Sequence, residues 1–565
     1  MLGVISSEPV RRHWRGSRAV EAATPPPPPP GRSRGRSITW STRGTLLAAG
    51  IGALVALPWL DQRLVWCGWL GVAGALLVAD RIRGWHGEIL TVASALIAIA
   101  IAFHWTPEAL ATALATDRWV GIAVATPIAA WDALRLAAPF LLVGRLGCRP
   151  HEAWLPAALA AVVAEAVMPG VFPWILGSAL VAWPPLVQSV EILGSGGATF
   201  VFFAHAGLLA AVFDIAGRSC GRLGEARPRM SRPGRLALAV CVANDLSGVV
   251  AAAAWQRSAA AAPVARLAVV QADPGDPDGL DALRSLTASA CADGRLPPAL
   301  VCWPECSGGG YADTLTSLAD PAVVLAHSRP PLAGLRPWEA PSRPLLFGGK
   351  LYSGHPDKPR AVHQAALLVD TAERIVGSYR KRHLMPFGEY VPGGDWLPEL
   401  ASQFAMQEEF ARGAEATVLH VTPALRVGVL LCYEDMLPEA ARSLVDNSAN
   451  VLVSLINGAA FPQTITLAQH RMLSQLRAVE NRRALVRCAA TGETCVISPE
   501  GRIVASLPVR DRGLLVADVP LLDTVNPARR LGRVFPLACG VGLAFDMARR
   551  WRGRRPAHHP PGSPP

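Results

Sequence analysis

Three short stretches in the second half of the chain place reactive side chains at the ends of apolar runs. The first is Trp303-Pro304-Glu305, which follows the apolar residues Val301 and Cys302. A carboxyl group that closes a buried strand has a raised pKa, which suits it to act as a general base. A surface carboxylate at a strand end is the alternative interpretation of Glu305.

The second stretch, YRKRHLMPFGEYVP at residues 379–392, combines Lys381, His383 and Glu389 with several turn-forming residues. It has too many proline and glycine residues for a helix and too many apolar residues for a plain linker. We therefore expect an ordered loop that lines a site. A basic, solvated loop is the alternative.

The third stretch, VGVLLCYED at residues 427–435, ends a strongly apolar strand on Cys432. A helix that began there would place the thiol near a helix N-terminus, which favours the thiolate. The acidic residues Glu434 and Asp435 follow directly. A buried core cysteine is the alternative interpretation.

The segments around these residues alternate between the period of a strand and that of a helix. Residues 278–294 and 464–483 have the apolar spacing of amphipathic helices, and CVISPEGRIVAS at 495–506 is typical of a hairpin. Five apolar runs are predicted as buried strands, at residues 266–273, 299–305, 365–370, 425–435 and 450–457. This alternation predicts a layered α/β domain over residues 265–530.

The composition points away from a soluble protein. Of the 565 residues, 51% are hydrophobic and only 17% are charged, against about 25% charged residues in an ordinary soluble domain. Mean hydropathy is +0.29. These values exclude a disordered protein, a coiled coil and a typical cytosolic enzyme. The 11 cysteines lack metal-ligand spacing, so we expect no metal site.

Apolar segments predict a membrane half over residues 44–255 and a last transmembrane helix at 531–547. Several are shorter than the roughly 20 residues that span a bilayer. The seven segments of the membrane half lie near residues 44–60, 64–80, 88–104, 119–143, 154–185, 196–217 and 235–255. Residues 154–185 have the composition of one span plus a re-entrant piece around Pro169 and Pro173.

Arginine placement predicts the topology. The net charge is +11, and the loops after the second, fourth and sixth spans carry far more arginine than the loops after the first, third and fifth. Arginine-rich loops face the cytoplasm. We therefore expect two cytoplasmic tails, a disordered Pro-rich one at 1–43 and a basic one at 548–565. The domain of residues 265–530 would lie on the periplasmic side of a bacterial inner membrane. Membrane topology accounts for the positive charge, so we expect no nucleic-acid partner.

Charged side chains inside apolar spans are energetically costly and indicate function. Asp132, Arg135, Glu165 and Asp214 meet this condition. Pairing within a helix, which the spacing of Asp132 and Arg135 permits, or an interfacial position is the alternative.

Taken together, Glu305, Lys381 and Cys432 resemble the Glu-Lys-Cys triad of the nitrilase, or carbon–nitrogen hydrolase, superfamily in both order and context. RAVEN at 477–481 is similar to the helix that follows the nucleophile strand in that superfamily. The resemblance implies a four-layer αββα sandwich, which periodicity alone does not predict.

The membrane half narrows this resemblance. GVFPW at 170–174, Gln188 and Gly194 resemble the membrane segment of apolipoprotein N-acyltransferases. KRHLMPFGEYVP is similar to their lysine-containing loop, and FARG at 410–413 is similar to the turn beyond it. The resemblance implies about eight spans joined to a nitrilase-like catalytic domain. It also implies an enzyme that moves a fatty acyl chain from phospholipid, through a Cys432 thioester, to the N-terminal diacylglyceryl-cysteine of an apolipoprotein.

The same resemblance implies a role for each member of the triad. Cys432 would be the nucleophile, Glu305 the general base, and Lys381 the group that stabilises the oxyanion. Three neighbouring side chains would support them: Glu389, Tyr433 and Glu434. The acyl-transfer chemistry that the resemblance implies needs no organic cofactor.

Two departures from the family pattern leave alternatives open. The family's N-D-A-W-F motif reads NGAAF at residues 457–461, and the asparagine usual before the strand at 365–370 is replaced around His363 and Gln364. Membrane nitrilase-domain proteins encoded with conjugal-transfer systems share this plan, and the chain could be such a paralogue. The alternatives are a membrane-tethered nitrilase or amidase acting on another carbon–nitrogen substrate, and a non-enzymatic conjugal-transfer envelope factor.

The charge pattern makes a testable prediction about topology. A reporter fused at Gly309 should give a periplasmic signal, and one fused at the C-terminus a cytoplasmic signal, because arginine-rich segments stay inside. A cytoplasmic signal from Gly309 would contradict the predicted topology.

Overall fold

The computed structural model describes residues 42–78, 84–220, 229–292, 297–308, 310–312, 343–355, 358–372, 374–394, 396, 410–459, 461, 464–525 and 527–552. The predicted disordered leader lies almost wholly outside these residues. Residues 553–565 of the predicted basic tail lie outside them as well.

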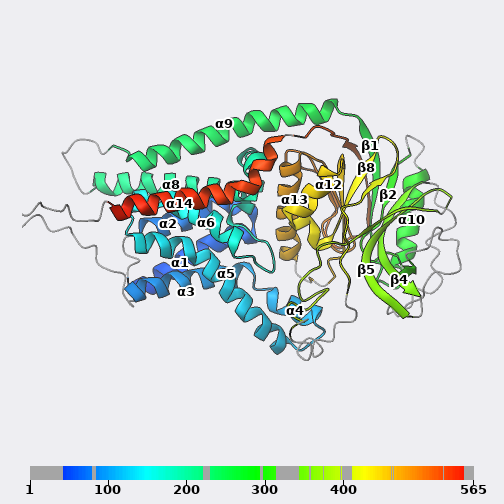
Figure 1. Ribbon diagram of the computed structural model, residues 1–565, viewed down its shortest axis with the longest axis horizontal. Helices are drawn as coiled ribbons and strands as arrows, with labels where there is room; N and C mark the ends of the chain where they lie inside the picture. The colour runs from blue at the N-terminus through cyan, green and yellow to red at the C-terminus, as the bar shows by residue number, and fades with distance from the viewer. Residues whose placement is uncertain are drawn as a thin grey trace, which may run out of the picture. The chain divides into compact units, whose positions relative to one another are not determined.

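Apolar helices make up the first half of the described chain (Figure 1). Every predicted apolar segment contains a helix: α1 (Thr42–Leu60), α2 (Val65–Leu77), α3 (Gly84–Ala102), α5 (Arg118–Leu146), α6 (Trp154–Val167), α8 (Ser195–Cys220), α9 (Arg232–Ala261) and α14 (Leu531–Arg552). Shorter pieces connect them: η1 (Gln62–Leu64), α4 (Thr106–Ala113), η3 (Pro150–Glu152), α7 (Val190–Leu193) and η7 (Pro527–Arg530).

Six of these helices, within the described residues, are long and apolar enough to cross a membrane. The exceptions are α2 with 13 residues and α6 with 14. The chain is therefore a multi-pass membrane protein, and the predicted count of about eight spans is approximate.

Between α6 and α8 the chain leaves the regular helical path. Helix α6 ends at Val167, and the 3-10 turns η4 (Leu176–Ala182) and η5 (Pro184–Val187) follow an irregular stretch. Pro169 and Pro173 explain this stretch, because proline lacks a donor N–H and disfavours a helical residue before it. The irregular stretch lies where the re-entrant piece was predicted.

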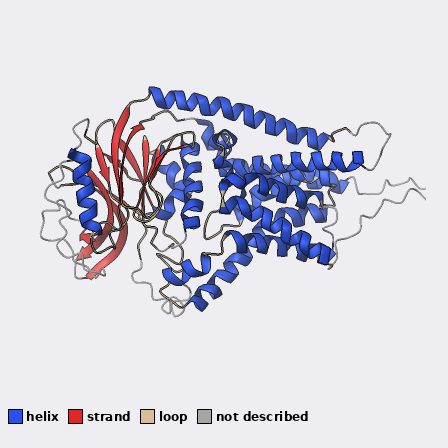
Figure 2. Cartoon of the chain, turned by 180° about the vertical axis from the view of Figure 1, so that it is seen from behind, coloured by secondary structure: helices blue, strands red, loops and turns tan. Residues whose placement is uncertain are grey.

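Two β-sheets stack face to face in the second half, between layers of helices (Figures 1 and 2). The seven-stranded sheet has the order β13-β1-β2-β4-β5-β6, with β3 beside β4, and the six-stranded sheet has the order β12-β11-β10-β9-β8-β7. Helix α10 (Gly279–Ala292) packs on the first sheet, and α12 (Pro438–Asp446) and α13 (Thr464–Asn481) pack on the second. The implied αββα sandwich is confirmed.

The strands are short and mostly buried. Those of the first sheet are β1 (Val264–Gln271), β2 (Leu300–Cys302), β3 (Gly310–Ala312), β4 (Leu345–His355), β5 (Lys358–Val369), β6 (Ile375–Arg380) and β13 (Gly513–Pro520). Those of the second are β7 (Val418–His420), β8 (Arg426–Leu431), β9 (Val451–Ile456), β10 (Leu485–Ala489), β11 (Cys495–Ile497) and β12 (Ile503–Ser506).

The strand directions bring the predicted site residues to one region. Strands β1, β2 and β4 run parallel, as do β8, β9 and β10. Strand β6 runs in the direction of β4, because β5 is antiparallel to both. Glu305, Lys381 and Cys432 each follow the carboxyl end of one of these strands, which is where open α/β sheets place their sites. The inner faces meet in a buried core that includes Leu346 and Leu430.

Helix α13 also binds the membrane half. The Gln469 side chain donates to the carbonyl oxygens of Trp59 at 3.0 Å and Ala102 at 2.9 Å. Its Oε1 accepts from the indole N–H of Trp105 at 3.1 Å. Every polar atom of this buried amide group is therefore used in joining the two halves.

A buried ion pair follows at the end of α13. Arg482 Nε lies 2.9 Å from Glu191 Oε2, and Arg482 Nη1 lies 2.6 Å from Gln188 Oε1. Gln188 Nε2 in turn donates to the carbonyl oxygen of Glu500 at 3.0 Å. The guanidinium group is thus held by side chains from the membrane half.

This ion pair predicts a large effect on stability. Arg482→Met should lower the free energy of unfolding in detergent by about 3–5 kcal/mol, because the buried Glu191 carboxylate would lose its guanidinium partner. Arg374→Met, which breaks an exposed ion pair with Asp370 at 2.7 Å, should cost about 1 kcal/mol or less. Equal small losses in a denaturant titration would contradict the structural role of Arg482.

Candidate active site

Cys432 sits at the turn between strand β8 and the 3-10 helix η6 (Cys432–Met436). Its φ of 48° lies in the left-handed region, which costs a residue with a side chain about 1–3 kcal/mol. The turn directs the thiol away from the sheet, where Sγ lies 3.9 Å from the carbonyl oxygen of Asn457. Strain of this kind persists only where the surrounding structure enforces it.

Glu305 lies three residues beyond strand β2 and is buried. Its Oε1 lies 3.4 Å from Lys381 Nζ, and its Oε2 accepts from the backbone N–H of Asn457 at 3.1 Å. Gly348 on the neighbouring strand β4 permits this placement, because a Cβ atom there would lie 2.6 Å from the Cα atom of Glu305. Any larger residue at 348 would displace the carboxylate.

Lys381 follows strand β6, and its side chain is only 1% exposed. Its Nζ donates to Glu389 Oε1 at 2.7 Å, so the ammonium group lies between two carboxylates. Glu389 Oε2 accepts from the backbone N–H of Met385 at 2.8 Å. The structure thus brings Glu305, Lys381 and Glu389 together, with the lysine in the middle.

Glu434 connects the turn of the cysteine to the loop of the lysine. Its carboxylate accepts backbone N–H groups from Leu431 at 2.9 Å, Arg382 at 2.8 Å and His383 at 3.1 Å. It also accepts from the hydroxyl group of Tyr379 at 2.8 Å. Four hydrogen bonds to one fully buried carboxylate fix the two segments relative to each other. His383 itself lies in this loop outside the triad.

The electrostatics of the site follow from burial and from this lysine. Burial raises the pKa of Glu305, the Lys381 charge opposes that rise, and the Glu389 carboxylate adds to it. Burial alone would lower the pKa of Lys381, but Glu389 and Glu305 outweigh it and raise that pKa well above its usual value. The lysine therefore stays charged.

The thiol is protonated at rest. Burial, and next the charge of Glu305, raise the pKa of Cys432 well above its usual value, although Lys381 opposes this. This shift is opposite to the one expected for a thiol at a helix N-terminus, because η6 is a short 3-10 turn in a buried place. A base must remove the proton before the sulfur can attack.

A narrow apolar pocket lies beside the thiol. Its walls come from both halves of the chain: Phe172, Trp174, Met385, Cys432, Tyr433, Met436, Phe461, Thr466, Leu467 and His470. The hydroxyl group of Tyr433 donates to the carbonyl oxygen of Val171 at 2.8 Å. The nucleophile therefore lies among apolar side chains of both halves of the chain.

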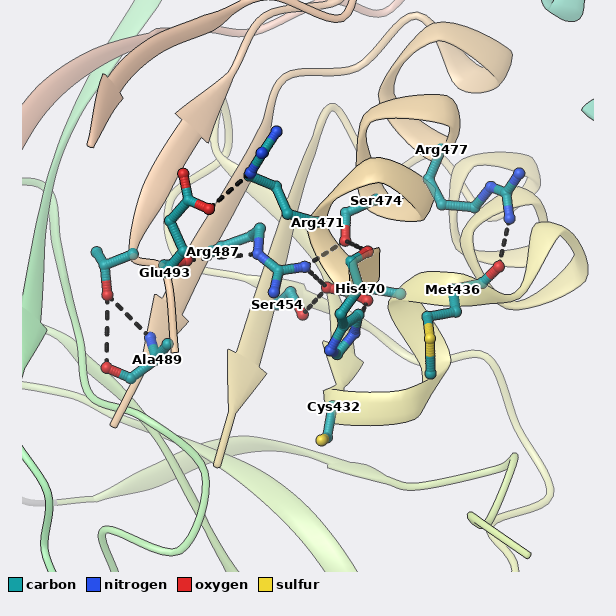
Figure 3. Close-up of polar contacts among 12 residues, drawn as sticks. Cys432, Met436, Ser454, His470, Arg471, Ser474, Arg477, Arg487, Ala489 and Glu493 are labelled. Atoms are coloured by element: carbon teal, nitrogen blue, oxygen red, sulfur yellow. Dashed lines mark hydrogen bonds and ion pairs between the residues drawn. The ribbon is translucent and has the colours of Figure 1, made fainter. Parts of the chain in front are cut away.

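A buried polar cluster behind the cysteine was missed by sequence reasoning (Figure 3). Asp435 accepts from Ser454 Oγ at 2.8 Å and Arg487 Nη1 at 2.7 Å, and it pairs with His470 Nε2. Burial favours the neutral acid, but His470 and Arg487 outweigh it and lower the pKa of Asp435 to about 2. In Figure 3 the Cys432 thiol points away from this cluster. The partners are too far apart in sequence for a local signal.

The two ends of the NGAAF motif, which match the family pattern, and the residues at 363 and 364, which depart from it, have structural roles. Asn457 supplies the N–H that holds Glu305, and Phe461 lies in the pocket, with its ring 5.9 Å from that of Trp105. The backbone carbonyl oxygen of Gln364 accepts a hydrogen bond from the backbone N–H of Lys381 at 2.8 Å. His363 Nδ1 lies 2.9 Å from the carbonyl oxygen of Ala411. Among the described residues, no group of three or more His, Cys, Asp or Glu side chains forms a metal site.

Comparison with known proteins agrees with this geometry. Residues 266–529 match the carbon-nitrogen hydrolase family. Apolipoprotein N-acyltransferase from Caulobacter vibrioides is 29% identical over 538 residues, which cover 90% of this chain and 94% of that protein. Its namesake from Geobacter metallireducens is 32% identical over 274 residues, which cover 48% and 49%. A crystal structure of an amidase from Nesterenkonia sp. shares 23% identity with a TM-score of 0.33, over 45% of this chain and 90% of that one.

The sandwich with its Glu-Lys-Cys site is therefore a carbon–nitrogen hydrolase domain, carried by a multi-pass membrane protein. Along almost its whole length the chain is related to the apolipoprotein N-acyltransferases, and the resemblance to that family is confirmed. These relatives support an acyltransferase of the same type.

The site predicts that one cysteine is indispensable. Cys432→Ala should abolish a covalent acyl-enzyme, while unfolding stays close to wild type because a small apolar residue leaves little cavity. Cys302→Ala and Cys306→Ala, which alter other free thiols of the chain, should retain the acyl-enzyme. Intact-protein mass spectrometry would detect the adduct, and its survival in Cys432→Ala would show that another group is the nucleophile.

Proposed function

We propose that the chain takes a fatty acyl chain from a membrane phospholipid as a thioester on Cys432. It then transfers this chain to the α-amine of an N-terminal diacylglyceryl-cysteine. The observation that carries this proposal is the apolar pocket, because the wall opposite Cys432 is formed by Phe172 and Trp174 of the membrane half. A hydrolase of small soluble amides has no need for such a wall.

In the first half-reaction, Glu305 accepts the proton of the Cys432 thiol, and the sulfur attacks the ester carbonyl carbon of the phospholipid. The oxyanion of the tetrahedral intermediate would be stabilised by the ammonium group of Lys381; such a donor contributes about 3–4 kcal/mol. When the intermediate collapses, the lysophospholipid alcohol leaves with the proton held by Glu305. Cys432 then carries the acyl group as a thioester.

In the second half-reaction, the neutral α-amine of the diacylglyceryl-cysteine attacks the thioester carbonyl carbon. Glu305 accepts a proton from the attacking nitrogen and returns it to the departing sulfur, so the thiol is regenerated and an amide forms. Lys381 would stabilise this second oxyanion as well. Glu389 supports the lysine through the 2.7 Å contact and transfers no proton.

Both substrates are lipids with their reacting groups near the membrane surface, which accounts for a nitrilase-like domain fixed to membrane helices. We place the chain in the bacterial inner membrane, with the catalytic domain on the periplasmic side. The arginine-rich loops support this orientation. The partners are then a phospholipid donor and a diacylglyceryl apolipoprotein acceptor.

A direct experiment uses the full chain in detergent with phospholipid as donor and a diacylglyceryl lipopeptide as acceptor. We expect a thioester on Cys432 in the absence of the acceptor and its loss when the acceptor is added, with formation of an N-acyl lipopeptide. Hydrolysis of soluble amides without any lipid-derived adduct would instead support a membrane-tethered amidase.

The two carboxylates should behave differently with pH. Glu305 must be ionised to accept the thiol proton, and burial raises its pKa. The rate of thioester formation should therefore fall as the pH drops through a value above the ordinary glutamate pKa of about 4.3. Glu389→Gln removes a negative neighbour that raises this pKa, so the acidic limb should move to lower pH.

Glu305→Gln removes the base and should slow single-turnover thioester formation by about 10²–10⁴-fold at every pH. Folding of each variant is checked by its thermal midpoint. A fast Glu305→Gln variant beside an inactive Glu389→Gln variant would make Glu389 the base.

A further inference from the structure

Residues 168–176, here called the 168–176 segment, form an irregular backbone among the apolar helices. A bilayer offers no water to unpaired N–H and C=O groups, so non-helical backbone at this depth must find partners within the protein. The segment carries Val171, Phe172 and Trp174, which contact the candidate site. What holds its backbone therefore also determines the shape of the pocket beside Cys432.

Side chains of helix α5 hold the carbonyl groups of the segment. Arg135 Nη2 donates to the carbonyl oxygen of Trp174 at 2.8 Å, and Nη1 lies 3.4 Å from that of Met168. The indole N–H of Trp131 donates to the carbonyl oxygen of Pro169 at 2.9 Å. One guanidinium group thus joins the two ends of the segment.

Two carboxylates complete this arrangement. Asp132 lies 3.4 Å from Arg135, and both side chains are about nine-tenths buried, so the aspartate balances the charge of the arginine. The second carboxylate, Glu165 on helix α6, accepts hydrogen bonds from the backbone N–H of Leu176 at 3.0 Å and from the hydroxyl group of Thr199 at 2.7 Å. Three of the four intramembrane charges singled out in the sequence therefore converge on one stretch of backbone.

Gly170 shows how closely the charges approach the segment. A Cβ atom on Gly170 would lie 3.0 Å from Asp132 Oδ1, 3.1 Å from Arg135 Nη1 and 2.7 Å from the carbonyl oxygen of Phe172. Contacts under 3.0 Å to backbone force a shift. The glycine permits the guanidinium group to lie directly against the backbone.

The segment separates two hollow regions. Phe172 and Trp174 line the pocket of Cys432, and they also line an open hollow among α3, α4 and α5 that includes Asp132. On the catalytic side, Tyr433, the neighbour of the nucleophile, donates to Val171. A change in the segment would therefore alter the wall that both hollow regions share.

We propose that Arg135, with its counterion Asp132, and Glu165 are positioning residues for acyl transfer. They hold the 168–176 segment as the wall that a long acyl chain lies against, and so determine how well long-chain donors bind. This inference rests on the proposed acyltransferase function of Cys432. None of the three residues touches the reacting atoms.

The test compares two donors in the full chain in detergent: a long-chain phospholipid and a short-chain, water-soluble activated ester, each giving a Cys432 thioester. Arg135→Gln keeps a polar side chain but loses the guanidinium group that joins the two ends. We expect its KM for the long-chain donor to rise about tenfold or more, while kcat and KM for the short-chain ester stay within about twofold of wild type. Arg145→Gln is the matched control, because Arg145 lies on the same helix in an exposed pair with Glu88.

Gly170→Ala provides a second route, because it displaces the segment without removing any charge. It should give the same selective rise in the long-chain KM, even where Arg135→Gln fails to fold. Arg135→Lys, which can still donate to one carbonyl oxygen, should restore part of the long-chain affinity. The proposal would be overturned if the ratio of the long-chain KM to the short-chain KM in Gly170→Ala were the same as in wild type. It would also be overturned if a folded variant lost activity equally with both donors. If the wild-type protein formed no thioester with the long-chain donor and none with the short-chain donor, the proposed function itself would be refuted.

Discussion

The ammonium group of Lys381 lies in the protein interior between the carboxylates of Glu305 and Glu389. Removing an ion from water costs several kcal/mol, and only close, well-aligned counterions offset that cost. The same contacts keep the lysine charged, and the lysine opposes the rise that burial causes in the pKa of Glu305. Charge stabilisation and proton transfer therefore depend on one buried arrangement, assembled from residues that follow three different strands.

A second set of buried polar groups holds the nucleophile turn from behind. Glu434 is hydrogen-bonded to the loop of the lysine, while Asp435 is paired with Arg487 and His470. Because consecutive carboxylates of η6 are fixed on both sides, Cys432 is kept in its left-handed conformation. The hydrogen bonds of Glu434 and Asp435 thus hold the nucleophile turn rigid, although neither carboxylate is assigned a step in the reaction.

Sequence reasoning identified the features that have a local signal. The five predicted strands, both amphipathic helices and the hairpin at 495–506 are present. The strands were recognisable as continuous apolar runs, because they are largely buried on both faces, and the helices by apolar spacing on one face. It did not predict β13, whose pairing with β1 joins residues about 250 positions apart. The resemblance of Glu305, Lys381 and Cys432 to a triad placed them near one another, and strand direction explains why they converge.

The cluster around Asp435 could not be predicted in this way. Asp435 followed the predicted nucleophile as one of an acidic pair, while Arg487 and His470 appeared as an ordinary strand residue and a helix residue. Only the stacking of α13 and β10 around η6 gives them a common partner. The number of spans was also uncertain from sequence, because α6 is short and an irregular stretch replaces the rest of its span.

The largest hydrophobic core of the molecule has no boundary between its two halves. It contains Trp59, Trp105 and Phe202 from the membrane helices together with Met436 and Leu476 from the sandwich. Separating the catalytic half as a soluble fragment would expose that core and leave the amide group of Gln469 and the guanidinium group of Arg482 without their partners. The two halves therefore share one core, and neither could be removed without exposing part of the other.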